Sequence, residues 1–445
     1  ITQCATMRGS VMPHRQGKWH ANERLSAACL HDHTLPLPMF AIAASQWDPV
    51  GMFQLLDIHL EKHLHKASEY ADNLTRLSGL LFPPNCDLVG PLHVQDMAAE
   101  NQLGASLLLA LSLMHCWHQE GDPAKATEIV LPLVQQQLAF CSDMQGTNRS
   151  SNWQYPLDAP LAAHLLPGMP DQGDAAGFLT NQALLHMCLA AMLDAARETH
   201  IPAEDVAYWQ QLLSESPMPS LSGLDATTDA VTAAMLAVYP GIPGSLDAPT
   251  SDAVQQISHY TRRLLAIKPG DSIRDTIRLT LSQSDKQAVS GLPLAWLGAC
   301  WARIGEGETA LALIERFMDQ CRGATLAETP GKGYFLVDSL VLAAAALGEL
   351  LLQSSTSTLY LLPALPDRWP KGEIKGIAGC RGVKVDMAWR QHQLVSATIH
   401  TSQPGEYRVV YRHLQTPDMQ ATDSEADPRL EAAGTLIFTA KANQS

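Results

Sequence analysis

Apolar residues recur at three- and four-residue spacing through most of this chain, in one segment after another from Met52 onward. That period gathers the apolar side chains on one face of an α-helix, so each segment predicts a helix with one buried stripe. The clearest segments are 51–77, 104–118, 124–140, 179–198, 205–213, 229–238, 252–266, 292–304, 308–321 and 335–353. Short gaps such as Gly121-Asp122-Pro123 and Gly305-Glu306-Gly307 predict that neighbouring helices form antiparallel hairpins.

The helical pattern stops near Thr358, and short alternating segments follow at 382–389, 394–400 and 407–411, which predict β-strands. The polar stretch 416–428 is expected to be a loose tail. With 445 residues, 46% of them hydrophobic, the chain holds more core material than one compact domain usually buries. We therefore expect a helical domain at 21–356 and a β-domain at 357–445.

The overall charge narrows the kinds of partner. The formal charge is −15, from 30 basic and 45 acidic residues, which argues against nucleic acid or an anionic membrane as a partner and favours a neutral or small-molecule ligand. No uninterrupted apolar run reaches the ~18 residues that suggest a membrane span. The nine cysteines are scattered, without a CxxC pair, and are expected to be buried free thiols.

Three segments carry a family resemblance. They are RGSVMPHRQGKW (8–19), SGLPLAWLGACWARIGEGETALALI (290–314), and FLVDSLVLAAAALGELLLQS with the following LYLLPALPDRWPKGEIKGI (335–377). In this order they resemble glycoside hydrolase family 95, whose known members are α-L-fucosidases and relatives. The resemblance implies an (α/α)6 toroid of helical hairpins followed by a small antiparallel β-domain, with no cofactor. It also implies that 1–20 is a linker from an N-terminal region missing here, and we expect a periplasmic or extracellular protein.

The resemblance also implies an inverting mechanism with an aspartate that activates water. Asp338 falls where that aspartate belongs, because FLVD matches the family's Phe-Gln-Ile-Asp. The residues around it depart from the family: 339–342 read Ser-Leu-Val-Leu in place of a Gly-Asn-Phe-Gly run, and Ser26 and Ala28 stand where two asparagines are expected.

The general acid is also replaced. The family places a glutamic acid before the helix at 179–198, but no glutamate occurs in 145–177, and Asp158 is the nearest acidic candidate. Asp171 and Asp174 are alternatives. The family's histidine-rich run is also absent, although Tyr239-Pro240-Gly241 is present.

The reaction itself requires two carboxyl groups, one protonated to assist the leaving oxygen and one ionised to deprotonate water. Asp338 suits the base, since an apolar helix end desolvates its carboxylate. The alternative for Asp338 is a helix N-cap or a buried partner of an arginine. For Asp158 the alternative is a loop aspartate that binds its own backbone.

Candidate substrate-binding residues lie in the long loops of the helical region. Trp153 could stack on a sugar ring, and Asp96, Glu100 and Asn85 could reach a pocket formed by loop ends. The alternatives are a packing tryptophan and solvated loop polar groups.

His59 and His63 have the four-residue spacing of a two-histidine metal site. HLEKH is not HExxH, and no third ligand is evident, so we expect no metal.

Together these features predict an inverting glycoside hydrolase of α-L-fucosidase type, acting on terminal L-fucose or L-galactose of a glycan. The alternative is a catalytically inactive barrel that binds carbohydrate or holds other domains.

Overall fold

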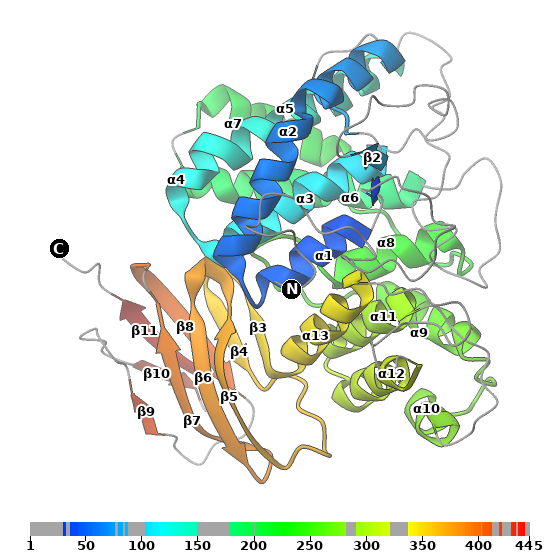
Figure 1. Cartoon of the computed structure of the whole chain (residues 1–445), viewed down its shortest axis with the longest axis vertical. Coiled ribbons are helices and arrows are strands. Elements are labelled where there is room, and N and C mark those ends of the chain that lie inside the picture. The colour runs from blue at the N-terminus through cyan, green and yellow to red at the C-terminus, as the bar shows by residue number, and fades with distance from the viewer. Residues whose placement is uncertain are drawn as a thin grey trace.

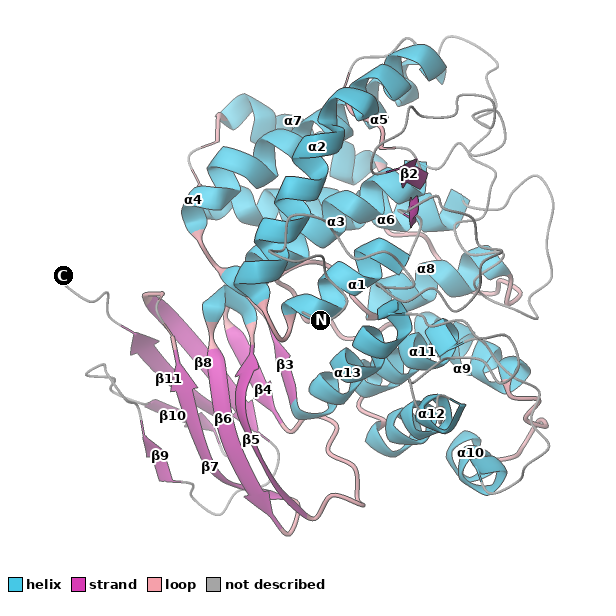
Figure 2. Ribbon diagram, in the orientation of Figure 1, coloured by secondary structure: helices cyan, strands magenta, loops and turns pink. Residues whose placement is uncertain are grey.

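The computed structural model describes residues 30–32, 36–75, 79–82, 85–87, 103–148, 178–199, 201–281, 291–320, 337–401, 403–411, 418–420, 429–432 and 435–440. Apart from one small pair of strands, the described elements up to Leu351 are helices, and strands predominate from Leu352 onward, as Figures 1 and 2 show. None of the helices in these ranges combines the length and apolar character needed to span a bilayer.

Six of the described helices form a closed inner ring in which each packs against the next. They are α1 (Pro36–Ser45), α3 (Leu103–Glu120), α6 (Phe178–Glu198), α8 (Thr228–Val238), α11 (Gly291–Ile304) and α13 (Val337–Leu351). The ring closes because α13 contacts both α11 and α1. These helices are buried nearly all round, as in α3, where every residue from Gly104 to His118 is buried.

The second helix of each hairpin packs on the outside of this ring. The outer helices are α2 (Pro49–Thr75), α5 (Leu131–Asn148), α7 (Ala203–Glu215), α9 (Ser251–Leu264) and α12 (Gly307–Gln320). A short helix α4 (Pro123–Lys125) and a π-helical turn η2 (Ala126–Val130) lead into α5, and α10 (Ile273–Leu281) packs on α12. The predicted toroid of paired helices is confirmed.

Two helices were not expected from the periodicity. The residues of α1, PLPMFAIAAS, have no polar face because this inner helix contacts α2, α3 and α13. A helix buried on all sides shows no amphipathic period. The other, α10, is only 9 residues long.

The β-domain contains two sheets (Figure 1). The five-stranded sheet has the order β10-β11-β8-β4-β3, and its strands are β3 (Leu352–Ser354), β4 (Thr358–Leu361), β8 (Gly405–Tyr411), β10 (Arg429–Ala432) and β11 (Thr435–Ala440). The four-stranded sheet has the order β5-β6-β7-β9, with β5 (Lys371–Ala378), β6 (Lys384–Arg390), β7 (Gln393–His400) and β9 (Asp418–Gln420). A 3-10 turn, η4 (Cys380–Gly382), joins β5 to β6.

Pairing in the two sheets is mainly antiparallel, with β4–β8 and β7–β9 parallel. Strand β9 lies in the stretch expected to be a loose tail, and it pairs with the edge of β7 although its three residues are too few to predict a strand. A separate two-stranded sheet pairs β1 (Leu30–Asp32) with β2 (Asn85–Asp87).

The inner helices all run toward the β-domain, which covers the end of the ring where they finish. A Cβ atom on Gly307, at the α11–α12 connection, would lie 1.9 Å from the carbonyl oxygen of Ala364. One on Gly121, at the α3–α4 connection, would lie 2.4 Å from Cα of Arg381. Only glycine permits such close approach of two backbones. We call this the β-domain end, and the end where the inner helices begin the distal end.

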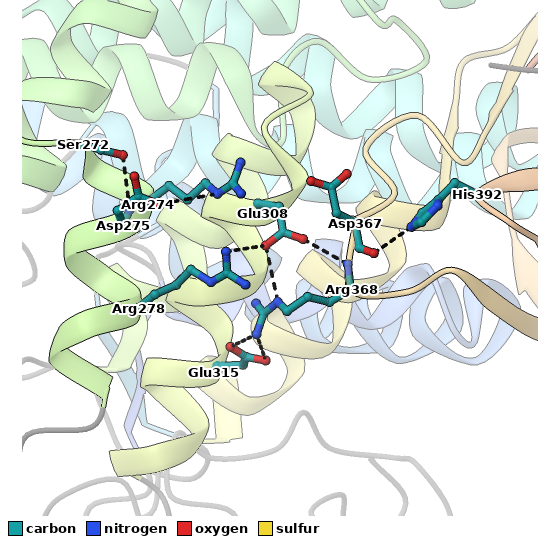
Figure 3. A network of polar contacts seen from close by, with 9 residues as sticks. All are labelled: Ser272, Arg274, Asp275, Arg278, Glu308, Glu315, Asp367, Arg368 and His392. Atoms are coloured by element: carbon teal, nitrogen blue, oxygen red, sulfur yellow. Dashed lines mark hydrogen bonds and ion pairs between the residues drawn. The ribbon is translucent and has the colours of Figure 1, made fainter.

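A network of ion pairs fastens the loop between β4 and β5 to the outer helices (Figure 3). The Arg368 guanidinium lies between two glutamates of α12, with Nε 3.3 Å from a carboxylate oxygen of Glu308 and Nη1 within 2.9 Å of both oxygens of Glu315. The backbone N–H of Arg368 also donates to Glu308 at 3.2 Å, and Arg278 of α10 approaches Glu308 at 3.8 Å. The network therefore connects α10, α12 and the β-domain.

Candidate active site at the distal end of the toroid

The distal end gathers the first turns of the inner helices, and Asp338 lies in the first turn of α13. Its residue is 2% exposed. Carboxylate Oδ1 accepts a hydrogen bond from the Ser339 backbone N–H at 2.8 Å, and the Ser339 hydroxyl lies 3.4 Å away. The free N–H groups of a first helical turn make a carboxylate a favourable hydrogen-bond acceptor at this position.

The residues after Asp338 serve packing. Ser339 and Leu342 are both 0% exposed, and Leu342 belongs to the continuous hydrophobic core. The residues after Asp338 therefore pack α13 against its neighbours in the ring.

A second carboxylate at this end, Asp229, joins two inner helices. It lies in the first turn of α8, and its two carboxylate oxygens accept hydrogen bonds from the backbone N–H groups of Leu179 and Thr180, each at 2.9 Å. The Thr180 hydroxyl donates to the same carboxylate at 2.5 Å. Asp229 therefore caps the start of α6, a role that the sequence gave no reason to expect.

Most of the other predicted site residues lie outside the described residues. These are Asp158, Asp171, Asp174, Trp153, Asp96, Glu100, Ser26 and Ala28. The backbone of Asn85 is described: it lies in β2 and pairs with Asp32 of β1. The roles proposed for these side chains remain predictions.

His59 and His63 lie on α2, where both are buried and their ring centroids are 4.7 Å apart in an edge-to-face arrangement. Within the described ranges, no three histidine, cysteine, aspartate or glutamate side chains form a group that could hold a metal ion. The five cysteines with described side chains, Cys116, Cys141, Cys188, Cys300 and Cys380, are buried free thiols, as predicted.

Sequence reasoning missed Glu349, which lies on α13 near the β-domain end. Its side chain is 2% exposed and forms an ion pair with Arg303 of α11, through both Nε and Nη2 of the guanidinium. Gln46, just after α1, donates to the same carboxylate at 2.6 Å. The pair therefore ties three ring helices together at the end of α13 opposite Asp338.

Two buried histidines of α3 lie near the same end of the ring. His115 Nε2 is 3.0 Å from the Gly241 carbonyl oxygen, and the His118 ring lies beside Trp117 with centroids 4.3 Å apart. Burial lowers the pKa of each imidazole from 6.5 to about 3. Both rings are therefore neutral at physiological pH.

Comparisons with known proteins bear on this arrangement. Residues 353–445 match the model for the C-terminal domain of glycoside hydrolase family 95. The chain is 27% identical over 288 residues to Alpha-L-fucosidase 2 of Arabidopsis thaliana, a match that covers 58% of this chain and 34% of that protein. It is also 27% identical over 137 residues to Probable alpha-fucosidase A of Aspergillus oryzae, covering 27% of this chain and 19% of that protein.

Among solved structures, a putative kojibiose phosphorylase from the human microbiome is similar with a TM-score of 0.51 and 11% identity, over 94% of this chain and 61% of that one. A sequence identity this low is evidence of a similar fold and of nothing more. The matched segments span about a third and a fifth of the two curated relatives. The comparisons confirm the resemblance to family 95 and the predicted fold, a helical toroid followed by a β-domain.

Proposed function

From this relationship to glycoside hydrolase family 95, we propose that the chain hydrolyses a terminal α-L-fucosyl or α-L-galactosyl residue of a glycan with inversion of the anomeric centre. The observation that carries the proposal is the position of Asp338. It is a buried carboxylate in the first turn of a ring helix, at the end where six inner helices begin. The names of the two curated relatives, both fucosidases, support L-fucose as the sugar.

In the proposed mechanism, Asp338 is the general base. Its carboxylate removes a proton from water, the water oxygen attacks the anomeric carbon, and the glycosidic bond breaks on the opposite face. A carboxylic acid, for which Asp158 is the candidate, protonates the departing oxygen. The two carboxyl groups of an inverting enzyme are separated by roughly 6.5 to 9.5 Å so that the water fits between them.

The proposal is tested with fluorogenic α-L-fucoside and α-L-galactoside on the wild type and on Asp338→Asn. We expect Asp338→Asn to lower kcat by about 10²- to 10⁴-fold, the usual contribution of a general base. Proton NMR of the first sugar released should show the inverted anomer.

The matched control is Glu349→Gln, which alters the other buried carboxylate of the same helix. It is expected to lower stability while the folded enzyme keeps its kcat. Equal loss of activity in both variants would mean that Asp338 supports the fold and is not the base.

One observation favours a second function, a catalytically inactive barrel that binds glycans. The residues after Asp338 are packed into the core, and the family's asparagines, glutamic acid and histidines are replaced. Under this alternative the wild type binds fucosylated glycans without hydrolysing either fluorogenic substrate, and Asp338→Asn leaves binding unchanged.

A further inference from the structure

A crevice lies between the connection from α8 to α9 and the five-stranded sheet. It consists of two adjoining hollows with volumes of about 390 and 370 Å³. Leu246, Asp247 and Tyr360 line both hollows, so the two are neighbours. Each falls within the size range of small-ligand sites, about 300 to 1,000 Å³, and such sites often lie between domains. Asp338 lines neither hollow.

Tyr360 presents its ring to this crevice. Its neighbours on β4, Leu359 and Leu361, are each 1% exposed, whereas Tyr360 is 36% exposed. Because side chains alternate along a strand, Tyr360 lies on the opposite face of the sheet from the core. Its register partners Gln353 on β3 and Val410 on β8 share that face and also line the crevice. The ring is therefore an aromatic surface that the core does not use.

Asp247 lies across the crevice from the sheet and is exposed. No described residue pairs with its carboxylate. Basic groups at the margins have their own partners, since Arg197 pairs with Asp194 at 3.1 Å and Arg303 pairs with Glu349. The crevice thus offers an acceptor without a surplus of positive charge, which disfavours an anionic ligand.

Hydroxyl groups also line the first hollow. Ser355, Ser357 and Thr358 contribute, and the hydroxyls of Ser357 and Thr358 lie 3.4 Å apart. A ligand that carries many hydroxyl groups and an apolar face matches this lining, because an aromatic ring suits the apolar face and an ionised carboxylate forms strong hydrogen bonds with hydroxyl donors.

A hydrogen bond and close packing hold the two sides of the crevice together. The Thr356 backbone N–H donates to the Gly244 carbonyl at 2.9 Å and so joins the α8–α9 connection to the turn between β3 and β4. A Cβ atom on Gly244 would lie 2.9 Å from both His118 Cε1 and Thr356 Cγ2, so the two segments are in close contact. A preformed site of this kind avoids the entropic cost of ordering loops on binding.

We propose that this crevice is a second carbohydrate site that binds a neutral oligosaccharide. One sugar ring stacks on Tyr360, and its hydroxyls donate hydrogen bonds to Asp247. The site lies at the β-domain end, whereas Asp338 lies at the distal end, so it holds a glycan chain without taking part in its cleavage. Binding here requires no hydrolysis, and the inference therefore stands apart from the proposed enzymatic activity.

The test is calorimetric titration of the full chain carrying Asp338→Asn, with 2′-fucosyllactose, cellotetraose and maltotetraose as neutral probes and a hyaluronan tetrasaccharide as the acidic probe. Adding Tyr360→Ala or Asp247→Ala should weaken binding of at least one neutral probe by about tenfold or more. Tyr360→Phe, which keeps the ring, should retain affinity within about twofold. Tyr208→Ala is the matched control, because Tyr208 is a comparably exposed tyrosine, 42%, on α7.

Three results would overturn the proposal: no neutral probe binds, binding is unchanged by Tyr360→Ala, or the acidic probe binds more tightly than the neutral ones. Hydrolysis of the small fluorogenic substrates, measured on Tyr360→Ala with Asp338 intact, separates this inference from the proposed function. A chain without hydrolysis but with Tyr360-dependent binding would refute the enzyme and support the crevice. Hydrolysis with Tyr360-independent binding would do the reverse.

Discussion

Replacing Glu349 with leucine should destabilise the protein strongly, because it leaves a buried guanidinium without its counter-charge. The Glu349 side chain is 2% exposed and that of Arg303 is 15% exposed. Burial by itself lowers the pKa of Arg303, but the charge and hydrogen bond of Glu349 outweigh it and raise that pKa above its usual value. Arg303 therefore keeps its charge, and removing Glu349 would leave that charge buried without its partner.

Breaking a buried ion pair by removing one partner costs about 3–5 kcal/mol. Arg303 also lines the second hollow of the crevice, where water can reach it. We therefore expect Glu349→Leu to cost about 3 kcal/mol and Arg303→Met, which strands the more deeply buried carboxylate, about 5 kcal/mol. The double variant should regain most of this loss, since apolar residues of similar volume often replace a buried pair without penalty.

Urea unfolding followed by circular dichroism at neutral pH measures the four free energies of unfolding. Together they form a double-mutant cycle, which isolates the coupling between the two side chains. A loss below about 1 kcal/mol in Glu349→Leu, or a double variant as unstable as the sum of the single ones, would refute this reasoning.

Two further predictions concern pH and the interface with the β-domain. Lowering the pH from 7 to 5 should reduce the free energy of unfolding by about 2 kcal/mol for each of His115 and His118, because these histidines bind protons below pH 6.5 in the unfolded chain but only near pH 3 in the folded protein. Urea midpoints measured as a function of pH test this. An equally steep pH dependence in His118→Gln would contradict it. Replacing Arg368 with methionine should cost about 1–2 kcal/mol, since its bidentate contact is only partly exposed. Arg274→Met, which removes an exposed ion pair, should lower the melting temperature far less than Arg368→Met does. Equal shifts in the two variants would show that the network around Arg368 adds no particular stability.

The sequence predicted helices of both layers, and it missed only α1 and α10 among the described helices of nine or more residues. For α9 we expected 252–266, and the helix runs Ser251–Leu264. The missed α1 is a short apolar segment without the amphipathic period that identifies a helix in a sequence. Strand β9 could not be foreseen either, because a three-residue edge strand depends on its neighbour rather than on its own pattern.

The two carboxylates of α13 also show which part of the site could not be predicted from the sequence. Asp338 was singled out as a charge in an apolar segment, but Glu349 has the same property and was overlooked. Its partner Arg303 is 46 residues away in the chain, and no local sequence pattern predicts an ion pair between residues so far apart.

The segments that carry the family resemblance proved informative about architecture. Arg303 and Glu308 come from the ARIGEGE turn and Arg368 from the LPALPDRW element, and all three form ion pairs within the ring or between the helices and the β-domain. These residues form contacts that hold the ring helices and the β-domain together. They indicate the fold independently of whether the distal residues are reactive.

The common direction of the inner helices has a consequence for how such a molecule diversifies. The chain returns to the distal end before each inner helix, so every connection there is a separate place where residues can be exchanged or inserted. The opposite end is covered by the β-domain and held by ion pairs, so changes in the distal connections leave its contacts intact. The residues of the distal connections can therefore change one connection at a time while the contacts that stabilise the fold are kept.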